Sequence, residues 1–256
     1  MNDKKRKKIS PPEYSKRSYR ETISSDDLVS SYVTVKETDL HILAAENVER
    51  QGYHSVHRYR NQLENYIAAH PAFLTSLVPL EPDVLAPPIV KGMLQAGAAA
   101  NVGPMAAVAG AIAHYVGMDL LNSGLEEVLV ENGGDIFVKR NRDCVAAIFA
   151  GRSPLNRKVG IRIPAAEMPA GLCTSSATVG HSLSLGKADS VTVLGQSALL
   201  ADAAATRLGN EVSTGGPGNI NDALGIAKTI PGITGVVIIC GKHMGAWGEI
   251  DLLRLP

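Results

Sequence analysis

Short runs rich in valine and isoleucine dominate the second half of the chain, and turn residues separate them. The runs are LEEVLVEN, DIFVKR, CVAAIFAG, KVGIRIP and SVTVLG, with GVVIICG and WGEIDLLRL near the C-terminus. Apolar runs of this length between Gly, Asn, Asp or Pro predict a largely antiparallel sheet. Helices are expected at 197–210 and 220–230. Strand runs with helices gathered in pairs favour an α+β fold in layers over a regular βαβ alternation.

The first half of the chain predicts a hairpin followed by helices. SSYVTVK and TDLHILAAE are expected to pair as two strands. Apolar residues then recur at helical spacing over 47–69, which indicates an amphipathic surface helix. A proline-rich connector over 73–88 leads to two close-packed helices of small residues, 89–100 and 104–121, the second beginning after Gly103. Polar residues interrupt this apolar stretch, which favours a buried helix pair over a membrane span. The small-residue faces could instead pack against a second subunit.

Length and charge restrict the class of protein. The chain has 256 residues, which suits one domain over 19–256, with two lobes possible, after a disordered basic tail over 1–18. The 25 basic and 25 acidic residues balance, so net charge gives no argument for binding nucleic acid or an anionic membrane. No secretory signal is visible, and we expect a cytoplasmic protein. Three widely spaced cysteines argue against a disulfide framework or a cysteine-only zinc site.

Asp202 and Thr206 stand one helical turn apart in LLADAAATRLGN, directly after the apolar run DSVTVLG. Side chains at i and i+4 lie on one face of a helix, so this carboxylate and hydroxyl could bind one hard cation. The alternative is that Asp202 caps a neighbouring backbone turn and Thr206 bonds back to a carbonyl of its own helix. Spacing alone leaves both interpretations open.

Three further clusters could carry chemistry. In ENGGDI, Gly133 and Gly134 can adopt positive φ while Asn132 and Asp135 supply polar groups, although a plain hairpin turn explains the motif equally well. The stretch 171–190 has little periodicity, and we interpret it as a loop that brings Cys173, a nucleophile candidate, near His181, a base candidate. A packed thiol is the alternative. STGGPGN could cradle a phosphate, but a flexible connector explains it better.

The motifs in their order resemble the ApbE-like superfamily, whose best-known members are magnesium-dependent flavin transferases that move FMN from FAD to a protein threonine. GPMAAVAGAIA, VENGGDI, CTSSATVGHSLSLGKADSVTV, LADAAAT and the ending WGEI are most similar to a cytoplasmic, uncharacterised branch of it, from about Asn101 onward. The resemblance implies an ApbE-like, T-fold-related single domain with a mainly antiparallel sheet backed by helices. It also implies a ligand held in a cleft between lobes.

Roles for individual residues follow from this resemblance. Asp202 and Thr206 match the transferases' Mg²⁺ ligands, and His181 matches their catalytic base, which would deprotonate an acceptor hydroxyl. FAD or a related dinucleotide is the implied ligand, and a protein is the implied acceptor. The implied cofactor-binding residues are Asn132, Gly133, Gly134, Asp135, Thr174, Ser175 and Ser176.

Departures from the family pattern leave two hypotheses. The chain has neither the SELSRLN-like motif nor the glycine-phenylalanine-aspartate segment of the transferases, and aromatic residues make up only 4% of it. Few side chains are thus available to stack on an isoalloxazine. The first hypothesis is a divergent Mg²⁺-dependent flavin or nucleotidyl transferase. The second is a non-flavin carrier or assembly factor of sulfur metabolism that uses Cys173, because this branch is associated with sulfide assimilation and homocysteine formation.

Overall fold

The computed structural model describes residues 27–177, 186–213 and 216–256. Its main element is an eight-stranded antiparallel sheet with the strand order β1-β2-β3-β4-β7-β8-β9-β10. The strands are β1 (Val29–Val35), β2 (Thr38–Ala44), β3 (Val128–Asn132), β4 (Asp135–Lys139), β7 (Ala170–Ser175), β8 (Ser190–Gly195), β9 (Ile233–Cys240) and β10 (His243–Gly248).

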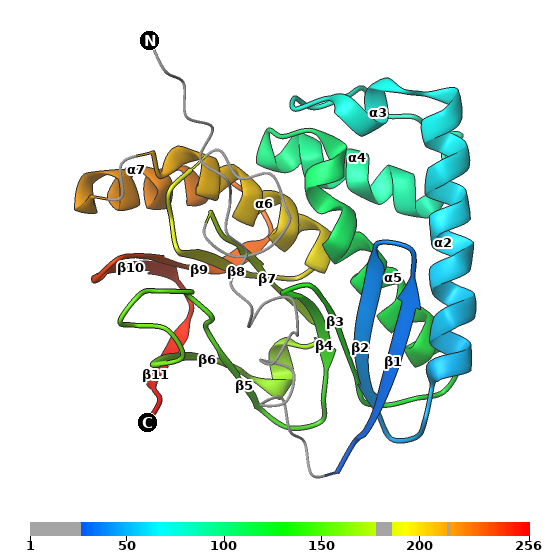
Figure 1. Cartoon of the computed structure of the whole chain (residues 1–256), viewed down its shortest axis with the longest axis horizontal. Coiled ribbons are helices and arrows are strands. Elements are labelled where there is room, and N and C mark those ends of the chain that lie inside the picture. Colours follow the sequence, from blue (N-terminus) through cyan, green and yellow to red (C-terminus); the bar gives the residue numbers. More distant parts are fainter. Residues whose placement is uncertain (1–26, 178–185, 214–215) are drawn as a thin grey trace, which may run out of the picture.

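The large sheet lies between a layer of helices and a smaller sheet, as Figure 1 shows. It separates two hydrophobic cores. A second, three-stranded sheet has the order β11-β6-β5 and covers one face; its strands are β5 (Cys144–Ala147), β6 (Val159–Ile163) and β11 (Asp251–Arg254). Helices cover the other face. Successive side chains of a strand point to opposite faces. Phe137 and Cys173 accordingly belong to the core under the helices, while Val138 and Leu172 belong to the core between the sheets.

The helix layer contains α2 (Glu49–Ala69), α3 (Ala72–Thr75), α4 (Pro88–Ala100), the 3-10 helix η2 (Pro104–Ala107), α5 (Val108–Asn122), α6 (Ala198–Glu211) and α7 (Pro217–Ala227). The segment Pro104–Asn122 is long and apolar enough to cross a membrane by length and composition, and half of it is buried inside the protein. Its α5 part packs against α2, α6, β3 and β4, as a core helix does. The small-residue faces of α4 and α5 are therefore buried within one chain.

The predicted α+β class and the antiparallel sheet are confirmed, with four local corrections. Strand β7 lies where a loop was expected, because its small residues are buried on both faces and show no alternation. The single strand expected over 247–255 is instead the end of β10 and all of β11, separated by a turn at Gly248, whose φ is +96°. The helix expected at 220–230 begins at Pro217. The connector over 73–88 contains α3.

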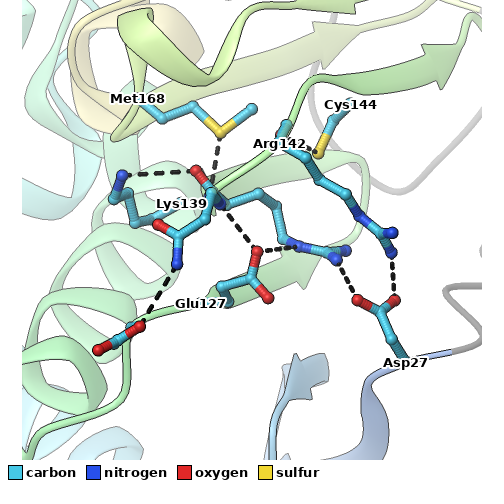
Figure 2. Close-up of polar contacts among 9 residues, drawn as sticks. Asp27, Glu127, Lys139, Arg142, Cys144 and Met168 are labelled. Atoms are coloured by element: carbon cyan, nitrogen blue, oxygen red, sulfur yellow. Dashed lines mark hydrogen bonds and ion pairs between the residues drawn. The ribbon is translucent and has the colours of Figure 1, made fainter.

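Arg140, just after β4, fastens the beginning of the described chain to the large sheet by pairing with Asp27 and Glu127, which are labelled in Figure 2. Its Nε donates to Glu127 Oε1 at 3.1 Å and its Nη2 to Asp27 Oδ2 at 2.7 Å. The Asp27 carboxylate also pairs with Arg142. Only 6% of the Arg140 side chain is exposed, so its charge depends on these two carboxylates.

Arg140→Met is expected to lower the free energy of unfolding by about 2 kcal/mol, because it leaves the Glu127 carboxylate partly buried without its guanidinium. Arg162→Met is the matched control: Arg162 also pairs with two carboxylates, Asp143 and Asp251, but 45% of its side chain is exposed. Its loss should cost less than about 0.5 kcal/mol. Urea unfolding of both variants measures the difference, and equal effects would contradict this account of Arg140.

Candidate functional site

The turn between β3 and β4 presents open backbone at one edge of the site. Asn132 and Asp135 face each other in the register, and both residues between them have positive φ, +70° for Gly133 and +109° for Gly134. A two-residue hairpin of this kind requires glycine-like conformations. Glu131 Oε1 accepts a hydrogen bond from the Gly134 N–H at 2.8 Å. A Cβ at Gly133 would meet no atom within 4 Å, so a ligand could approach the backbone there.

The beginning of α6 is held between two glycines. A Cβ on Gly171 of β7 would lie 2.3 Å from the Ala198 nitrogen, and a Cβ on Gly110 of α5 would lie 2.2 Å from the Ala198 oxygen. Real Cβ atoms do not approach backbone this closely, so only glycine allows both contacts. As a result, α6 lies directly against the sheet and against the first turn of α5, and Asp202 enters the space between these three elements.

Asp202 caps the first turn of α5. Its Oδ2 accepts a hydrogen bond from the Gly110 N–H at 2.8 Å, and Gly110 belongs to the helix turn whose N–H groups have no partner inside the helix. The capping alternative is thus confirmed for this oxygen. Even so, burial raises the pKa of Asp202 from 3.8 to about 7, although the N–H groups of Gly110 and Ala109 act in the opposite direction. Capping alone does not compensate the buried charge.

Asp135 lies close to Asp202 and shares its surroundings. It is on the same face of β4 as Phe137, which is the face that the helices cover. Only 8% of Asp135 is exposed, and its buried Oδ1 has no hydrogen-bond partner among the residues that the structure describes. Burial, and then the charge of Asp202, raises the pKa of Asp135 well above its ordinary value, although the neighbouring Cys173 side chain and Thr174 N–H act in the opposite direction. The buried carboxyl group of Asp135 and the partly buried carboxyl group of Asp202 therefore interact under the helices.

Cys173 lies beside these carboxyl groups as a buried thiol. It is fully buried, and its Sγ donates to the Ala198 carbonyl oxygen at 3.3 Å. Burial raises its pKa well above the ordinary value, and the neighbouring carboxylates of Asp135 and Asp202 raise it further. A nucleophilic cysteine requires the opposite, an accessible thiol with a lowered pKa. The packed-thiol alternative describes Cys173, and the proposed role as nucleophile is disfavoured.

Cys173 is expected to resist alkylation in the folded protein. Burial raises the pKa of both thiols, but Cys144 is only half-buried, whereas Cys173 is fully buried and its pKa is raised well above the ordinary value. Under native conditions at pH 8 we expect iodoacetamide to label Cys144 at least about 100 times faster than Cys173, because the reaction requires an accessible thiolate. Mass spectrometry of timed digests measures both rates, and a denatured sample serves as the control. Comparable native rates would show that Cys173 is accessible.

Comparison with known proteins identifies the family. A family model described as "AbpE bacteria" matches residues 20–223. A UPF0280 protein of Methanococcus maripaludis strain C5 is 42% identical over 225 residues, which are 86% of this chain and 91% of the relative. Another, of Methanocaldococcus jannaschii, is 40% identical over 230 residues, 86% of this chain and 91% of the relative. The chain belongs to the family that this model and these relatives represent. The predicted resemblance to the ApbE-like superfamily is confirmed.

Solved ApbE structures share the fold. The H257G mutant of the flavin transferase ApbE from Vibrio cholerae superposes with a TM-score of 0.56 at 14% identity, covering 86% of this chain and 97% of that one. The flavinyl transferase ApbE of Pseudomonas stutzeri, in its apo form, also gives 0.56, at 15% identity, covering 88% and 95%. At this identity the likeness establishes the ApbE fold only.

The remaining residues that the ApbE resemblance implicated are spread over the site. Asn132 Nδ2 donates to the Ala109 carbonyl oxygen at 3.0 Å, which ties the hairpin turn to the beginning of α5. The Thr174 side chain bonds Thr192 at 3.0 Å on the sheet face away from Asp135, so only its backbone serves the site. Ser175 lies against Gly209 of α6, farther along that helix than Asp202. Ser176 follows the end of β7.

Of the last two implicated residues, Thr206 and His181, the structure describes only the first. Thr206 lies on α6 and is half-buried, one turn after Asp202, as the sequence predicts. His181 lies outside the described residues. Sequence reasoning missed Gly110, whose N–H donates to Asp202, because GPMAAVAG suggested only close helix packing. The combination of a glycine in the first turn of one helix with an aspartate on the next is the signal that could have revealed it.

The donor set of this ApbE-like site suits a hard cation. Within 27–177, 186–213 and 216–256, no group of three His, Cys, Asp or Glu residues could hold a metal ion on its own. Several His, Cys or carboxylate ligands are what a softer metal commonly requires. Mg²⁺ differs, because it commonly takes one or two carboxylates and completes its shell with water and substrate phosphates. Asp202, the hydroxyl of Thr206 and the orphaned Oδ1 of Asp135 are hard oxygen donors that fit this pattern.

Proposed function

We propose that this protein is a magnesium-dependent transferase that acts on a pyrophosphate-containing ligand such as FAD, with the ion at Asp202 and Thr206. One observation carries the proposal. Asp202 is placed between α5, α6 and the sheet, and burial raises its pKa to about 7, which means that its charged form lacks compensation in the free protein. A bound divalent cation would supply that compensation.

The residues around Asp202 have separate tasks in this proposal. Asp202 and Thr206 hold the ion, and the α5 N–H of Gly110 fixes the orientation of the Asp202 carboxylate. The turn at Gly133 and Gly134 accommodates the pyrophosphate, because glycine has no side chain there and a Cβ at either position would come no closer than 3.9 Å to another atom of the described residues. Asn132 keeps that turn against α5. When bound, magnesium offsets negative charge on the pyrophosphate oxygens.

The transfer proposed here is a displacement at phosphorus. An acceptor hydroxyl forms a new O–P bond to the FMN phosphate, the bond from that phosphorus to the bridging oxygen breaks, and AMP leaves with the electron pair. A general base takes the hydroxyl proton. The assignment of that base to His181, and of a protein hydroxyl as the acceptor, rests on the sequence resemblance. Flavin transferase activity is named for the Vibrio cholerae and Pseudomonas stutzeri proteins, whose fold this chain shares.

Phosphorus NMR with manganese tests where the ligand binds. With protein and substoichiometric Mn²⁺ in place of magnesium, both ³¹P resonances of FAD should broaden far more than with Mn²⁺ alone. Asp202→Asn should remove the additional broadening, because it removes the carboxylate that holds the ion. FMN, which lacks the pyrophosphate, is the comparison ligand. Equal broadening with wild type, with Asp202→Asn and without protein would refute a metal-held pyrophosphate at this site.

No observation in the structure favours the sulfur-metabolism alternative. It requires a reactive thiol at residue 173, whereas the Cys173 thiol is fully buried and its pKa is raised. The thiol donates to the Ala198 carbonyl and lies beside two carboxyl groups, which makes it part of the packing that positions Asp202. We therefore pursue only the transferase proposal.

A further inference from the structure

We propose that Asp135 is a further ligand of the cation site, so that one divalent ion is held jointly by the carboxylates of Asp135 and Asp202. The inference deepens the proposed function, on which it rests, and assigns Asp135 a role separate from shaping the hairpin turn. It concerns the oxygen Oδ1 of Asp135, for which the described protein provides no partner.

The position of Asp135 is fixed by the sheet. It is the first residue of β4, opposite Asn132. It follows two glycines that have the positive φ values which the tight turn requires. Its side chain lies on the helix-covered face, near enough to Asp202 for the two charges to interact. The neighbouring strand β7 contributes the Thr174 N–H to this carboxyl group, and it places the Cys173 thiol, which donates to the Ala198 carbonyl oxygen, beside it. Asp135 is therefore held beside Asp202, and its Oδ1 has no hydrogen-bond partner among the described residues.

A buried acceptor without a partner is uncommon and costs free energy. An unsatisfied buried polar group typically costs about 1–3 kcal/mol, and more when it is charged. The surroundings are apolar: Ala201, Ala203, Ala204 and Ala205 of α6 are all buried. No lysine, arginine or histidine side chain is among the described groups that shift the pKa values of these two carboxyls. A divalent cation would satisfy Oδ1 and neutralise both charges together.

The ligand count agrees with a magnesium-like ion. Two carboxylate oxygens and the Thr206 hydroxyl leave about three positions of an octahedral shell for water and phosphate oxygens. If Asp202 were the only carboxylate that bound the ion, the negative charge of the Asp135 carboxylate would remain uncompensated beside it. The pairing explains why an aspartate occupies a buried position where an asparagine could form the same turn.

Titration of Mn²⁺ alone into the nucleotide-free protein tests this inference, with the heat of binding as the readout. Asp135→Asn keeps the shape and removes the charge, and we expect it to weaken Mn²⁺ binding at least about tenfold. Asp202→Asn should do the same. Two controls are matched: Asp222→Asn removes an exposed carboxylate on α7, and Glu131→Gln removes a nearby charge while keeping an acceptor for the Gly134 N–H. Asp222→Asn should stay within about threefold of wild type, because its charge is exposed and screened by solvent, and Glu131→Gln should weaken binding less than Asp135→Asn does.

The possible outcomes separate this inference from the proposed function. If Asp202→Asn weakens Mn²⁺ binding and Asp135→Asn stays within about threefold of wild type, Asp135 is not a ligand, while the metal site at Asp202 stands. If neither substitution changes binding, both proposals fail. If Glu131→Gln weakens binding as much as Asp135→Asn, the effect is one of general charge and the ligand assignment is overturned. Circular dichroism verifies folding, and Asp135→Ala replaces Asp135→Asn if the latter is unfolded.

Discussion

Gly110→Ala is expected to lower the free energy of unfolding by about 3 kcal/mol, because the added methyl group has no room beside the backbone of α6. The added Cβ would lie 2.2 Å from the Ala198 carbonyl oxygen and 2.8 Å from the Asp202 Cβ. The first of these atoms is backbone and has no rotamer to move into, so α5 and α6 must separate. That separation would also lengthen the hydrogen bond from the Gly110 N–H to Asp202.

Gly225→Ala is the matched control for this substitution. Gly225 lies inside α7, and a Cβ there would meet no atom within 4 Å. Alanine favours the helix over glycine by up to about 1 kcal/mol, so this variant should be slightly more stable than wild type. Chemical unfolding of both variants measures the contrast. A Gly110→Ala protein as stable as wild type would show that α5 and α6 are not in the close contact described here.

The metal-free protein is expected to lose stability as the pH rises from 6.5 to 8.5. Burial raises the folded-state pKa of Asp202 from 3.8 to about 7, and that of Asp135 also rises. The folded state therefore binds more protons than the unfolded chain, and its stability falls as the pH rises through the folded-state pKa. At about 1.4 kcal/mol per pH unit for one group, the expected loss is about 1–2 kcal/mol, or several degrees in Tm.

The range from pH 6.5 to 8.5 avoids most of an opposing contribution that His114 makes to the pH dependence of stability. Burial lowers the pKa of His114 from 6.5 to about 4, so this residue makes the folded state more stable as the pH rises toward 6.5 and adds nothing above it. Thermal unfolding in EDTA at pH 6.5, 7.5 and 8.5 measures the trend, and Asp202→Asn should flatten it. Added Mg²⁺ should restore stability most at pH 8.5, which lies above the pKa of about 7 for Asp202, so that this carboxyl is ionised there. A Tm that is constant or rises with pH in EDTA would contradict the assigned surroundings of Asp202.

The sequence predicted the layers of the fold well where periodicity is strong. The hairpin of β1 and β2, the helix α2 and the runs that form β3, β4 and β8 all show the spacing of their element, and the structure has them. Strand β7 was wrongly predicted as a loop. Its residues AGLCTS are small and weakly β-forming, and they are in a strand because both faces are buried between α6 and the second sheet. Such tertiary burial is invisible in a local pattern.

The same limit applies to the candidate site. The spacing of Asp202 and Thr206 correctly placed both residues on one helix, and the Asn-Gly-Gly-Asp motif correctly predicted positive φ at both glycines. Asp135 and Asp202 are 67 positions apart in the sequence. No local pattern could show that their carboxyl groups lie close enough to interact. Nor could it show that Cys173 packs beneath them instead of facing solvent. These relations arise from strand order and from the glycine contacts of α6.

Calorimetric titration of FAD tests the central claim most directly, with wild type and Asp202→Ala each measured in Mg²⁺ and in EDTA. The account predicts that wild type binds FAD in Mg²⁺, that EDTA weakens this binding at least about tenfold, and that Asp202→Ala shows only the weak binding in both buffers. FAD binding by wild type that is equal in Mg²⁺ and in EDTA, and unchanged in Asp202→Ala, would contradict a metal-held pyrophosphate site at Asp202.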